Sequence, residues 1–405
     1  MNDDELLASV QQATFRYFWD FAHPDSGMAR EGLRHPRDTC TTGGTGFGVL
    51  TIMVGAQRGF VSREAAARRV LKIARFLADK ATRYHGAWSH WIHGVTGKTI
   101  LFAGKDDDGG DIVETAFLVQ GLLAARQYFD RDDEVERELR TLVDRLWRDV
   151  EWDWYLGDPP GKQLLWHWSP RVGFQRGHRI GGHFNECMIA YVLAIASPTH
   201  PIPPDCYYAG WVHDAKTYAN GKTFYGRRLA VGFDYGGPLF FTHYSYLGLA
   251  PQAVTDRFCN YFDNNRTITL INHAYCADNP KGFAGYGDLV WGLTASFSVD
   301  GYRAHEPRVD NGTITPTAAI SAMPYTPKKS LATLKYFYRE LGARIWGPFG
   351  FRDAFNLQRD WVSDTYLAID QGTIAPMIEN HRTGLCWRMF MRDADVVRGL
   401  KKAGI

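Results

Sequence analysis

Six glycine-marked apolar segments recur along this 405-residue chain, and they constrain its fold more than any other feature. Each segment opens with a Gly-containing turn and continues through small and apolar residues with almost no Lys or Arg. A helix that is apolar all round is a buried helix, so each segment predicts an inner helix. Consecutive markers are 55 to 75 residues apart, which is room for roughly two helices and two loops. The markers are Gly44, Gly110, Gly182, Gly237, Gly312 and Gly372.

Stretches of a second kind lie between these segments and have one apolar face and one charged face. Such stretches are typical of the outer helices of a globular protein. They cover residues 4–21, 62–80, 134–150, 328–346 and 395–402. Inner helices alternating with outer ones predict an all-α fold, an (α/α)6 toroid or six-hairpin barrel. A helical solenoid and two stacked bundles are the alternatives. Strand-like runs are few, and no Pro- or Ser-rich linker divides the chain, so residues 1–405 are expected to form one domain.

Composition excludes several classes of function. The net charge is only +2, without a basic block, so neither nucleic acid nor an anionic membrane is an expected partner. The sequence contains no run of 18 apolar residues, so no membrane span is expected. The N-terminus lacks the features of a signal peptide, so we expect a cytoplasmic protein as encoded, or a periplasmic one if a leader has been removed. The six scattered cysteines form no C-x-x-C pair and are expected to be free thiols. The sequence does not set the oligomeric state.

Carboxylates cluster where the inner helices are expected to begin. Asp111 and Glu114 lie one and four residues after Gly110, and Glu186 lies four residues after Gly182. Glu114 and Glu186 therefore take the same place in consecutive repeats. Packed helices are about 8–10 Å apart, which would put the two carboxyls ~5–10 Å apart, the range that glycosidases use. Asp370 stands at the same rim. The sequence predicts catalytic carboxylates here, with helix caps or structural ion pairs as the alternative.

Aromatic residues in polar, Gly-rich loops suggest a site for sugar rings, whose C–H faces stack on flat side chains. A core role is the alternative for any single tryptophan. Neighbouring polar side chains are expected to bind sugar hydroxyls. The predicted substrate contacts are Trp88, Trp91, Trp166, Trp168, Tyr235 and Trp291, together with Arg30, Asp107, Asn185 and His243.

Other chemistries find little support in the motifs. The histidines show no zinc spacing, and no phosphate-binding loop or G-x-S-x-G motif occurs, so neither a metal nor a cofactor is expected. Asp107, Asp108 and Asp111 match the D-D-x-x-D motif of terpene synthases. Those enzymes need a second acidic motif on a facing helix, and the sequence has none.

Several of these motifs together resemble a known family. TTGGTGFG, HGAWSHWIHGVTGK, DDDGGDIVETAFLVQGLL, WHWSP, GFDYGGPLFFTHYS and AIDQGTIAPMIENHRTGL are similar to the glucoamylase-like domain of glycoside hydrolase family 144, over about residues 10 to 400. The resemblance implies an (α/α)6 barrel that hydrolyses β-1,2-glucan with inversion. It also implies that Asp111, Glu114 and Glu186 are essential, with Asp370 as a further candidate. One departure is DDDGGD, where the family more often has K-D-N-G-G-D, so Asp108 adds a negative charge.

On this basis we expect Glu186 to be the general acid, Asp111 the base and Glu114 the residue that orients the water. Asp370 is an alternative base, acting directly or through a chain of waters. The expected products are sophorose or short β-1,2-glucooligosaccharides, by endo or exo attack. The alternatives are a carbohydrate-binding protein on the same fold without turnover, and an (α/α)6 hydrolase of another glucan linkage.

Overall fold

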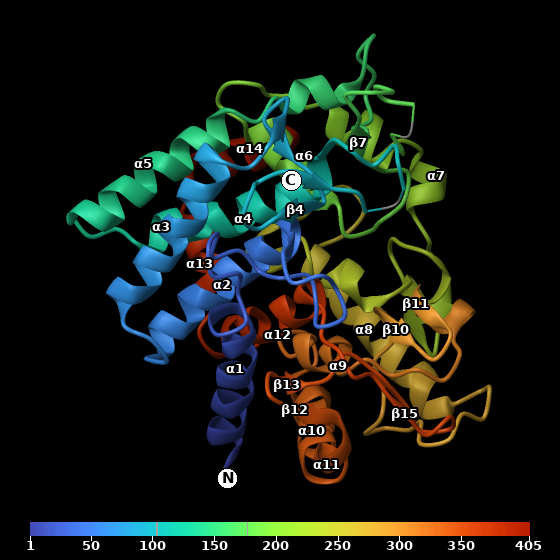
Figure 1. Ribbon diagram of the computed structural model, residues 1–405. Coiled ribbons are helices and arrows are strands. Elements are labelled where there is room, and N and C mark those ends of the chain that lie inside the picture. Colours follow the sequence, from blue (N-terminus) through green and yellow to red (C-terminus); the bar gives the residue numbers. More distant parts are fainter. Residues whose placement is uncertain (103, 176) are drawn as a thin grey trace.

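The computed structural model describes residues 1–102, 104–175 and 177–405, and it is rich in helices (Figure 1). The helices are α1 (Asp3–Trp19), α2 (Thr42–Arg58), α3 (Arg63–Asp79), α4 (Ile112–Tyr128), α5 (Glu134–Arg148), α6 (Met188–Ala196), α7 (Ala215–Tyr218), α8 (Tyr261–Asp278), α9 (Pro316–Ser321), α10 (Pro327–Arg339), α11 (Gly342–Ile345), α12 (Ala368–Arg382), α13 (Leu385–Met391) and α14 (Ala394–Ala403). The prediction of an all-α protein is confirmed at this level.

Strands are short and lie in the connections between helices. Most pair as local hairpins, but β1 pairs with β4, and β6 with β7, across two intervening α-helices. One sheet has the order β1–β4–β5, and the other strands pair two by two, all antiparallel. The strands are β1 (Thr39–Thr41), β2 (Arg83–Tyr84), β3 (Ala87–Trp88), β4 (Trp91–His93), β5 (Thr99–Ile100), β6 (Gly110–Asp111), β7 (His167–Trp168), β8 (Thr223–Phe224), β9 (Arg227–Arg228), β10 (Ala295–Ser298), β11 (Gly301–Ala304), β12 (Trp346–Gly347), β13 (Gly350–Phe351), β14 (Phe355–Asn356) and β15 (Trp361–Val362).

The outer helices α3 and α5 begin at side-chain caps and bury one apolar stripe each. Ser62 accepts a hydrogen bond from the backbone of Ala65, and Asp133 accepts one from the backbone of Glu136. The two helices pack against each other. Their charged faces lie outward, as the one-sided pattern of the sequence predicts.

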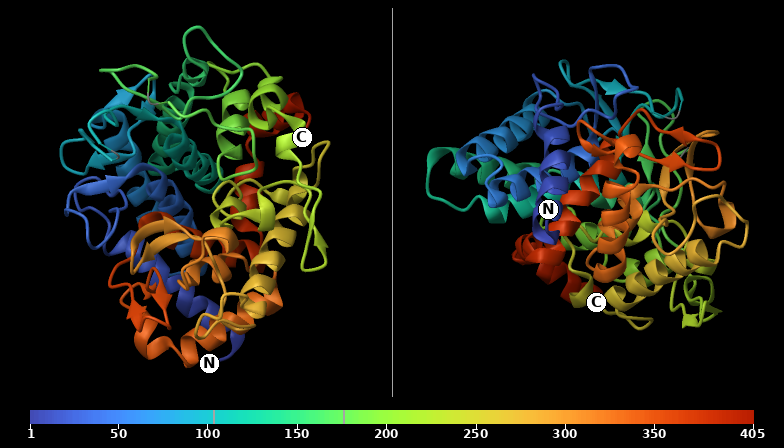
Figure 2. Two further views of the ribbon diagram at one scale, coloured as in Figure 1. Left: turned by 90° about the vertical axis from the view of Figure 1, so that its right-hand side faces the viewer. Right: turned by 90° about the horizontal axis from the view of Figure 1, so that it is seen from below.

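The inner helices α2, α4 and α12 are buried along most of their length. Helix α12 packs against α1 and α2, and the views in Figure 2 show the red C-terminal helices beside the blue N-terminal ones. The chain therefore closes on itself. The six cysteines are free thiols. Among the described residues, no helix is both long enough and apolar enough to cross a membrane.

Glycines allow the backbones of α2 and α4 to touch. A Cβ at Gly121 would lie 2.1 Å from the carbonyl oxygen of Gly46, which is backbone and cannot turn aside. We expect Gly121→Ala to lower the free energy of unfolding by about 1–3 kcal/mol, although alanine favours helix more than glycine. Urea unfolding measures this loss. Gly342→Ala in α11 is the control, because its Cβ would meet only one oxygen at 3.7 Å. Equal stability of the two variants would contradict close packing here.

Three of the six expected inner helices differ from the prediction. The segment after Tyr235 forms short 3₁₀ turns at Asp234–Gly236 and Leu239–Thr242 instead of an α-helix. Tyr235, Gly236 and Gly237 have positive φ and Pro238 follows them, which prevents helical hydrogen bonding at this point. The segment after Gly312 is helical only over α9, which starts at a proline.

The third difference concerns α6, which begins at Met188, six residues after its marker glycine. Gly181 and Gly182 both have positive φ, so the chain is still turning where the helix was expected to start. Glu186 therefore precedes α6, whereas Glu114 lies in the first turn of α4. The prediction that Glu114 and Glu186 take matching helical positions is wrong. Helix α8 completes the outer layer and was not predicted.

Candidate active site

A cavity of about 390 Å³ lies at the starts of α2, α4 and α12 and under the β10–β11 hairpin. Carboxylates of three glutamates reach it, and its walls are largely aromatic. Such a cavity, apolar with a few convergent polar groups, is typical of a small-molecule site. The lining includes Glu31, Glu114, Glu186, His90, Trp91, Phe102, Phe117, Trp166, Phe240, Tyr244, Phe297 and Tyr302.

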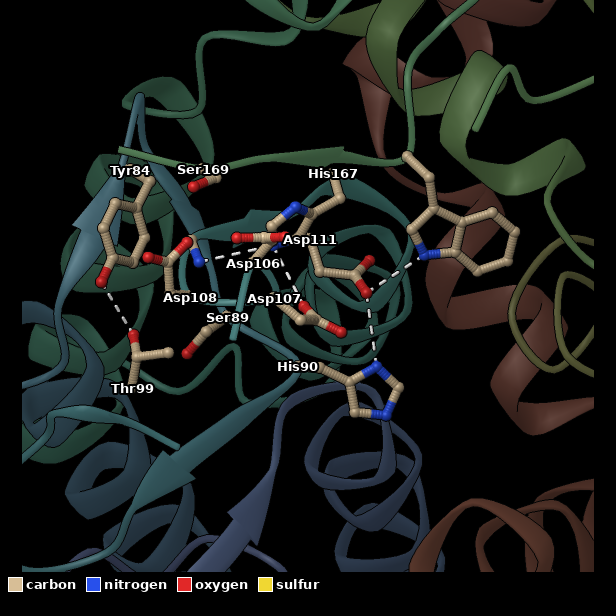
Figure 3. Close-up of polar contacts among 12 residues, drawn as sticks. Tyr84, Ser89, His90, Thr99, Asp106, Asp107, Asp108, Asp111, His167 and Ser169 are labelled. Atoms are coloured by element: carbon tan, nitrogen blue, oxygen red, sulfur yellow. Dashed lines mark hydrogen bonds and ion pairs between the residues drawn. The ribbon is translucent and has the colours of Figure 1, made fainter. Parts of the chain in front are cut away.

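Asp111 is the N-cap of α4 and also part of a wider hydrogen-bond network. Its Oδ1 accepts hydrogen bonds from the backbone of Val113 and Glu114, at 3.0 and 2.9 Å. Its Oδ2 accepts one from Trp166 Nε1 at 3.1 Å and lies 3.3 Å from His90 Nδ1 (Figure 3). Four donors therefore occupy this carboxylate. Asp111 lines an adjoining cavity of about 240 Å³ rather than the larger one.

Glu114 joins α4 to the start of α2. Its Oε2 accepts a hydrogen bond of 2.6 Å from the backbone of Gly43, and a Cβ at Gly43 would collide with the same oxygen. Its Oε1 lies 3.9 Å from His90 Nδ1. Burial raises the pKa of Glu114 to about 7, although His90 acts to lower it. The carboxyl therefore releases its proton less readily than an ordinary glutamate.

Glu186 is the carboxyl best placed to give a proton. It lines the cavity, and within the described parts of the chain it forms no salt bridge. Its backbone carbonyl accepts a hydrogen bond from Ser245 Oγ, which fixes the turn before α6. Burial raises the pKa of Glu186 to about 7, so much of it keeps its proton near neutrality. A general acid needs this property.

His90 was not predicted, and it links the two cavities. Its ring lies flat on Phe102, with centroids 3.7 Å apart, and its Nδ1 faces Asp111 and Glu114. Figure 3 shows the contact with Asp111. Burial acts to lower its pKa, but Glu114 and Asp111 outweigh this effect and raise it to about 9. His90 is therefore an imidazolium between two acids. His90 lies in the motif HGAWSHWIHG, in which the sequence pattern indicated only the two tryptophans as substrate contacts.

Asp370 lies behind the wall of the cavity and does not line it. Its carboxyl is 3% exposed, and its Oδ1 accepts a hydrogen bond of 3.1 Å from the hydroxyl of Tyr244. Tyr244 itself lines the cavity. Burial, together with the charge of Asp353, holds the pKa of Asp370 well above its usual range.

Two of the predicted aromatic contacts are core residues. Trp88 and Trp291 have no exposed surface. Their indole nitrogens donate hydrogen bonds inside the protein, to Leu77 O and Thr333 Oγ1 respectively. We therefore correct the prediction that they contact substrate. Trp91 and Trp166 do line the cavity.

Trp168 and Tyr235 do not line either cavity beside the acids. Trp168 packs edge-on against His85, and Tyr235 packs on Phe224 with centroids 4.5 Å apart. Both rings thus contact other loops. The exposed rings at the cavity are Tyr302, 52% exposed on β11, and Phe102, 46% exposed. These two were not predicted, because neither lies in a motif that marks a sugar site.

The four predicted polar contacts have different surroundings. Asp107 lies 3.0 Å from His167 Nε2, and both line the adjoining cavity. The guanidinium of Arg30 lies over the ring of Phe21. Asn185 Oδ1 accepts a hydrogen bond from the backbone of Cys187, so this side chain caps the turn before α6.

His243 is 2% exposed and lines neither cavity, so the structure does not support a substrate contact. Burial lowers its pKa to about 3. The additional charge of Asp108 is balanced by Arg171, which also pairs with Asp106. This pairing explains how the loop tolerates the departure from the family motif.

Comparison with known proteins identifies the family. A family model described as a putative glucoamylase matches residues 178–394. A solved structure of a putative glucoamylase from Bacteroides uniformis is 53% identical, with a TM-score of 0.97, over 100% of this chain and 97% of that one. The chain belongs to glycoside hydrolase family 144. The resemblance seen in the sequence motifs is thus confirmed.

Two relatives of this family 144 chain have more specific names. The exo β-1,2-glucooligosaccharide sophorohydrolase of Parabacteroides distasonis is 47% identical over 99% of this chain. The family 144 chain spans only 58% of that relative's length. The endo-β-1,2-glucanase of Chitinophaga pinensis, solved with sophorotriose and glucose, is 46% identical with a TM-score of 0.95, over 100% of this chain and 98% of that one.

Proposed function

We propose that this protein hydrolyses β-1,2-linked glucan. The observation that carries the proposal is Glu186, a carboxyl with a pKa of about 7 in an aromatic cavity, with further acids along the same walls. Relatives that are 46–47% identical and named for β-1,2-glucan or β-1,2-glucooligosaccharides support this linkage. We also propose that the helices form an (α/α)6 toroid. Support for this comes from the contacts that α12 makes with α1 and α2, which close the chain.

In the proposed reaction, Glu186 protonates the oxygen of the leaving sugar while a water attacks the anomeric carbon from the opposite face. We do not assign the base to Asp111, because four hydrogen-bond donors already occupy its carboxylate. We assign the base to Asp370, which is connected to the cavity through the hydroxyl of Tyr244. Glu114 and the His90 imidazolium bind substrate and orient the water. Trp91, Trp166, Phe102 and Tyr302 provide faces for sugar rings.

A product profile tests the proposed substrate. Linear β-1,2-glucan should give sophorose or short β-1,2-glucooligosaccharides, whereas β-1,3-glucan, β-1,4-glucan and starch should remain intact. The order in which products appear separates attack inside the chain from attack at its end. Turnover of starch with none of β-1,2-glucan would contradict the proposal.

Inversion predicts the configuration of the first product. An acid and a base that act from opposite faces, with a water between them, give the α-anomer from a β-linkage. Proton NMR during the first minutes of hydrolysis should show the α-anomeric signal rise before mutarotation. An initial β signal would exclude inversion, and it would then assign a nucleophile instead of a base.

A further inference from the structure

A second buried carboxyl, Asp353, lies beside Asp370. Asp353 is in the loop between β13 and β14, whereas Asp370 is in the first turn of α12. The two are 5% and 3% exposed, and their carboxyls lie within hydrogen-bonding reach of each other. Asp353 Oδ1 and Asp370 Oδ2 are both buried, and no donor from the described residues reaches either oxygen. A proton held between the two carboxyls would satisfy both oxygens.

The other oxygen of each carboxyl is fixed from the wall of the cavity. The backbone N–H of Phe297 donates to Asp353 Oδ2 at 2.8 Å, and the hydroxyl of Tyr244 donates to Asp370 Oδ1 at 3.1 Å. Phe297 and Tyr244 both line the cavity. The pair is therefore one residue away from the cavity, held in a defined orientation.

The charges around the pair do not neutralise two carboxylates. Arg34 is the cation that acts on Asp353, but its guanidinium pairs with Asp364 at 2.6 Å. On the cavity side, Glu31 adds a negative charge that acts on Asp370, and the charges of both aspartates act on Tyr302. Neither aspartate forms a salt bridge within the described ranges. Two adjacent buried carboxyls that form no salt bridge with a cation do not both ionise near neutral pH.

We propose that Asp353 and Asp370 share one proton and that Asp353 is the positioning residue that keeps Asp370 ready to accept a second. Burial raises the pKa of Asp353 to about 6, in keeping with a pair that carries one negative charge at neutral pH. The catalytic part of this proposal rests on the proposed function. The sharing of the proton does not.

In the proposed step, one proton passes from the attacking water to the aspartate pair and another leaves Glu186. The attacking water gives a proton to Tyr244 Oη as Tyr244 passes its own proton to Asp370 Oδ1. The water oxygen forms a bond to the anomeric carbon, the glycosidic C–O bond breaks, and the Glu186 proton goes to the leaving oxygen. The pair ends with two protons and Glu186 ends ionised, and exchange with solvent restores both.

The first experiment needs no substrate. Infrared spectra of protein labelled with ¹³C in its aspartate carboxyls separate the C=O stretch of a protonated Asp from those of Glu114 and Glu186. We expect one protonated aspartate at neutral pH, a band that persists into the alkaline range and disappears in Asp353→Asn. Absence of this band in the unsubstituted protein would overturn the shared proton, even if Asp353→Asn does not fold.

The second experiment tests positioning through the pH profile of kcat/KM. The charge of Asp353 and its hydrogen bond both raise the pKa of Asp370, so without this partner the pKa of Asp370 falls. We expect the acid limb of the profile to move down by about one pH unit in Asp353→Asn, or tenfold in activity below the limb, and by less in Asp353→Leu, which offers the carboxylate no hydrogen bond. KM should change little. An unmoved acid limb in both variants, with the infrared band present, would overturn the positioning role. A missing activity in the unsubstituted protein would instead contradict the proposed function.

Discussion

Replacing Glu186 with Gln is expected to lower kcat on β-1,2-glucan by about 10²–10⁴-fold, the usual contribution of a general acid. Glutamine has the same shape but cannot give a proton to the leaving oxygen. The kinetic measurement should be made at the pH optimum, together with thermal unfolding. Stability should not fall, because the raised pKa of Glu186 makes the unfolded chain release this proton more readily than the folded protein does. The carboxyl opposes folding increasingly between about pH 4.5 and pH 7, so Glu186→Gln should be slightly more stable near neutral pH.

A change of leaving group separates the acid role from substrate binding. An aryl β-sophoroside with an acidic phenol needs little protonation, so Glu186→Gln should retain most of its activity on this substrate. Glu138→Gln is the matched control, because Glu138 lies on the outer face of α5 and forms an exposed pair with Arg75. If Glu186→Gln keeps near-normal activity on β-1,2-glucan, Glu186 is not the acid.

Removing Glu379 is expected to have the largest effect on stability. This residue of α12 is completely buried, and Arg58 of α2 donates two hydrogen bonds to it, at 2.6 and 2.9 Å. Gln11 of α1 and Thr383 add further hydrogen bonds. Glu379→Ala leaves Arg58 without its partner, so we expect a loss of about 3–5 kcal/mol in the free energy of unfolding. Urea unfolding measures this loss.

The double variant Arg58→Ala/Glu379→Ala tests whether the lost pair or the remaining charge is responsible. Removing both partners leaves no uncompensated charge, so the double variant should lose less than the sum of the two single ones. Glu138→Ala, which breaks the exposed pair with Arg75, should cost less than about 1 kcal/mol. Strictly additive losses would show that Arg58 and Glu379 do not act as a pair.

The Glu379 network also predicts the response to acid. Arg58, Thr383 and Gln11 overcome the effect of burial and lower the pKa of Glu379. A carboxyl whose pKa is lower in the folded state stabilises the protein above its unfolded pKa, and this stability is lost as the pH falls through the folded pKa. His243 acts in the same direction, because burial lowers its pKa to about 3 and the unfolded chain binds a proton first. Acid should therefore destabilise the fold.

The pattern of apolar residues correctly predicted the helices that are buried on all sides and those that are buried along one stripe. Helices α2, α4 and α12 follow from apolar segments with almost no Lys or Arg, and α3 and α5 follow from one-sided stripes. The pattern failed after Tyr235, because three successive residues with positive φ cannot continue a helix. Nor could it separate Trp88 from Trp91. These side chains lie on β3 and β4, two short strands that are consecutive in the chain. Only the packing decides that Trp88 is buried while Trp91 lines the cavity.

The sequence by itself determined the helical layers and the carboxylates near the starts of inner helices, because both depend on local composition and spacing. The tertiary structure alone decided what each carboxylate does. It placed His90 between Asp111 and Glu114, left Glu186 without an ion pair among the residues that the structure describes, and brought Asp353 next to Asp370 from a different element. The physical reason is that a carboxyl's protonation depends on its burial and on the charges that face it, and these come from residues far apart in the chain.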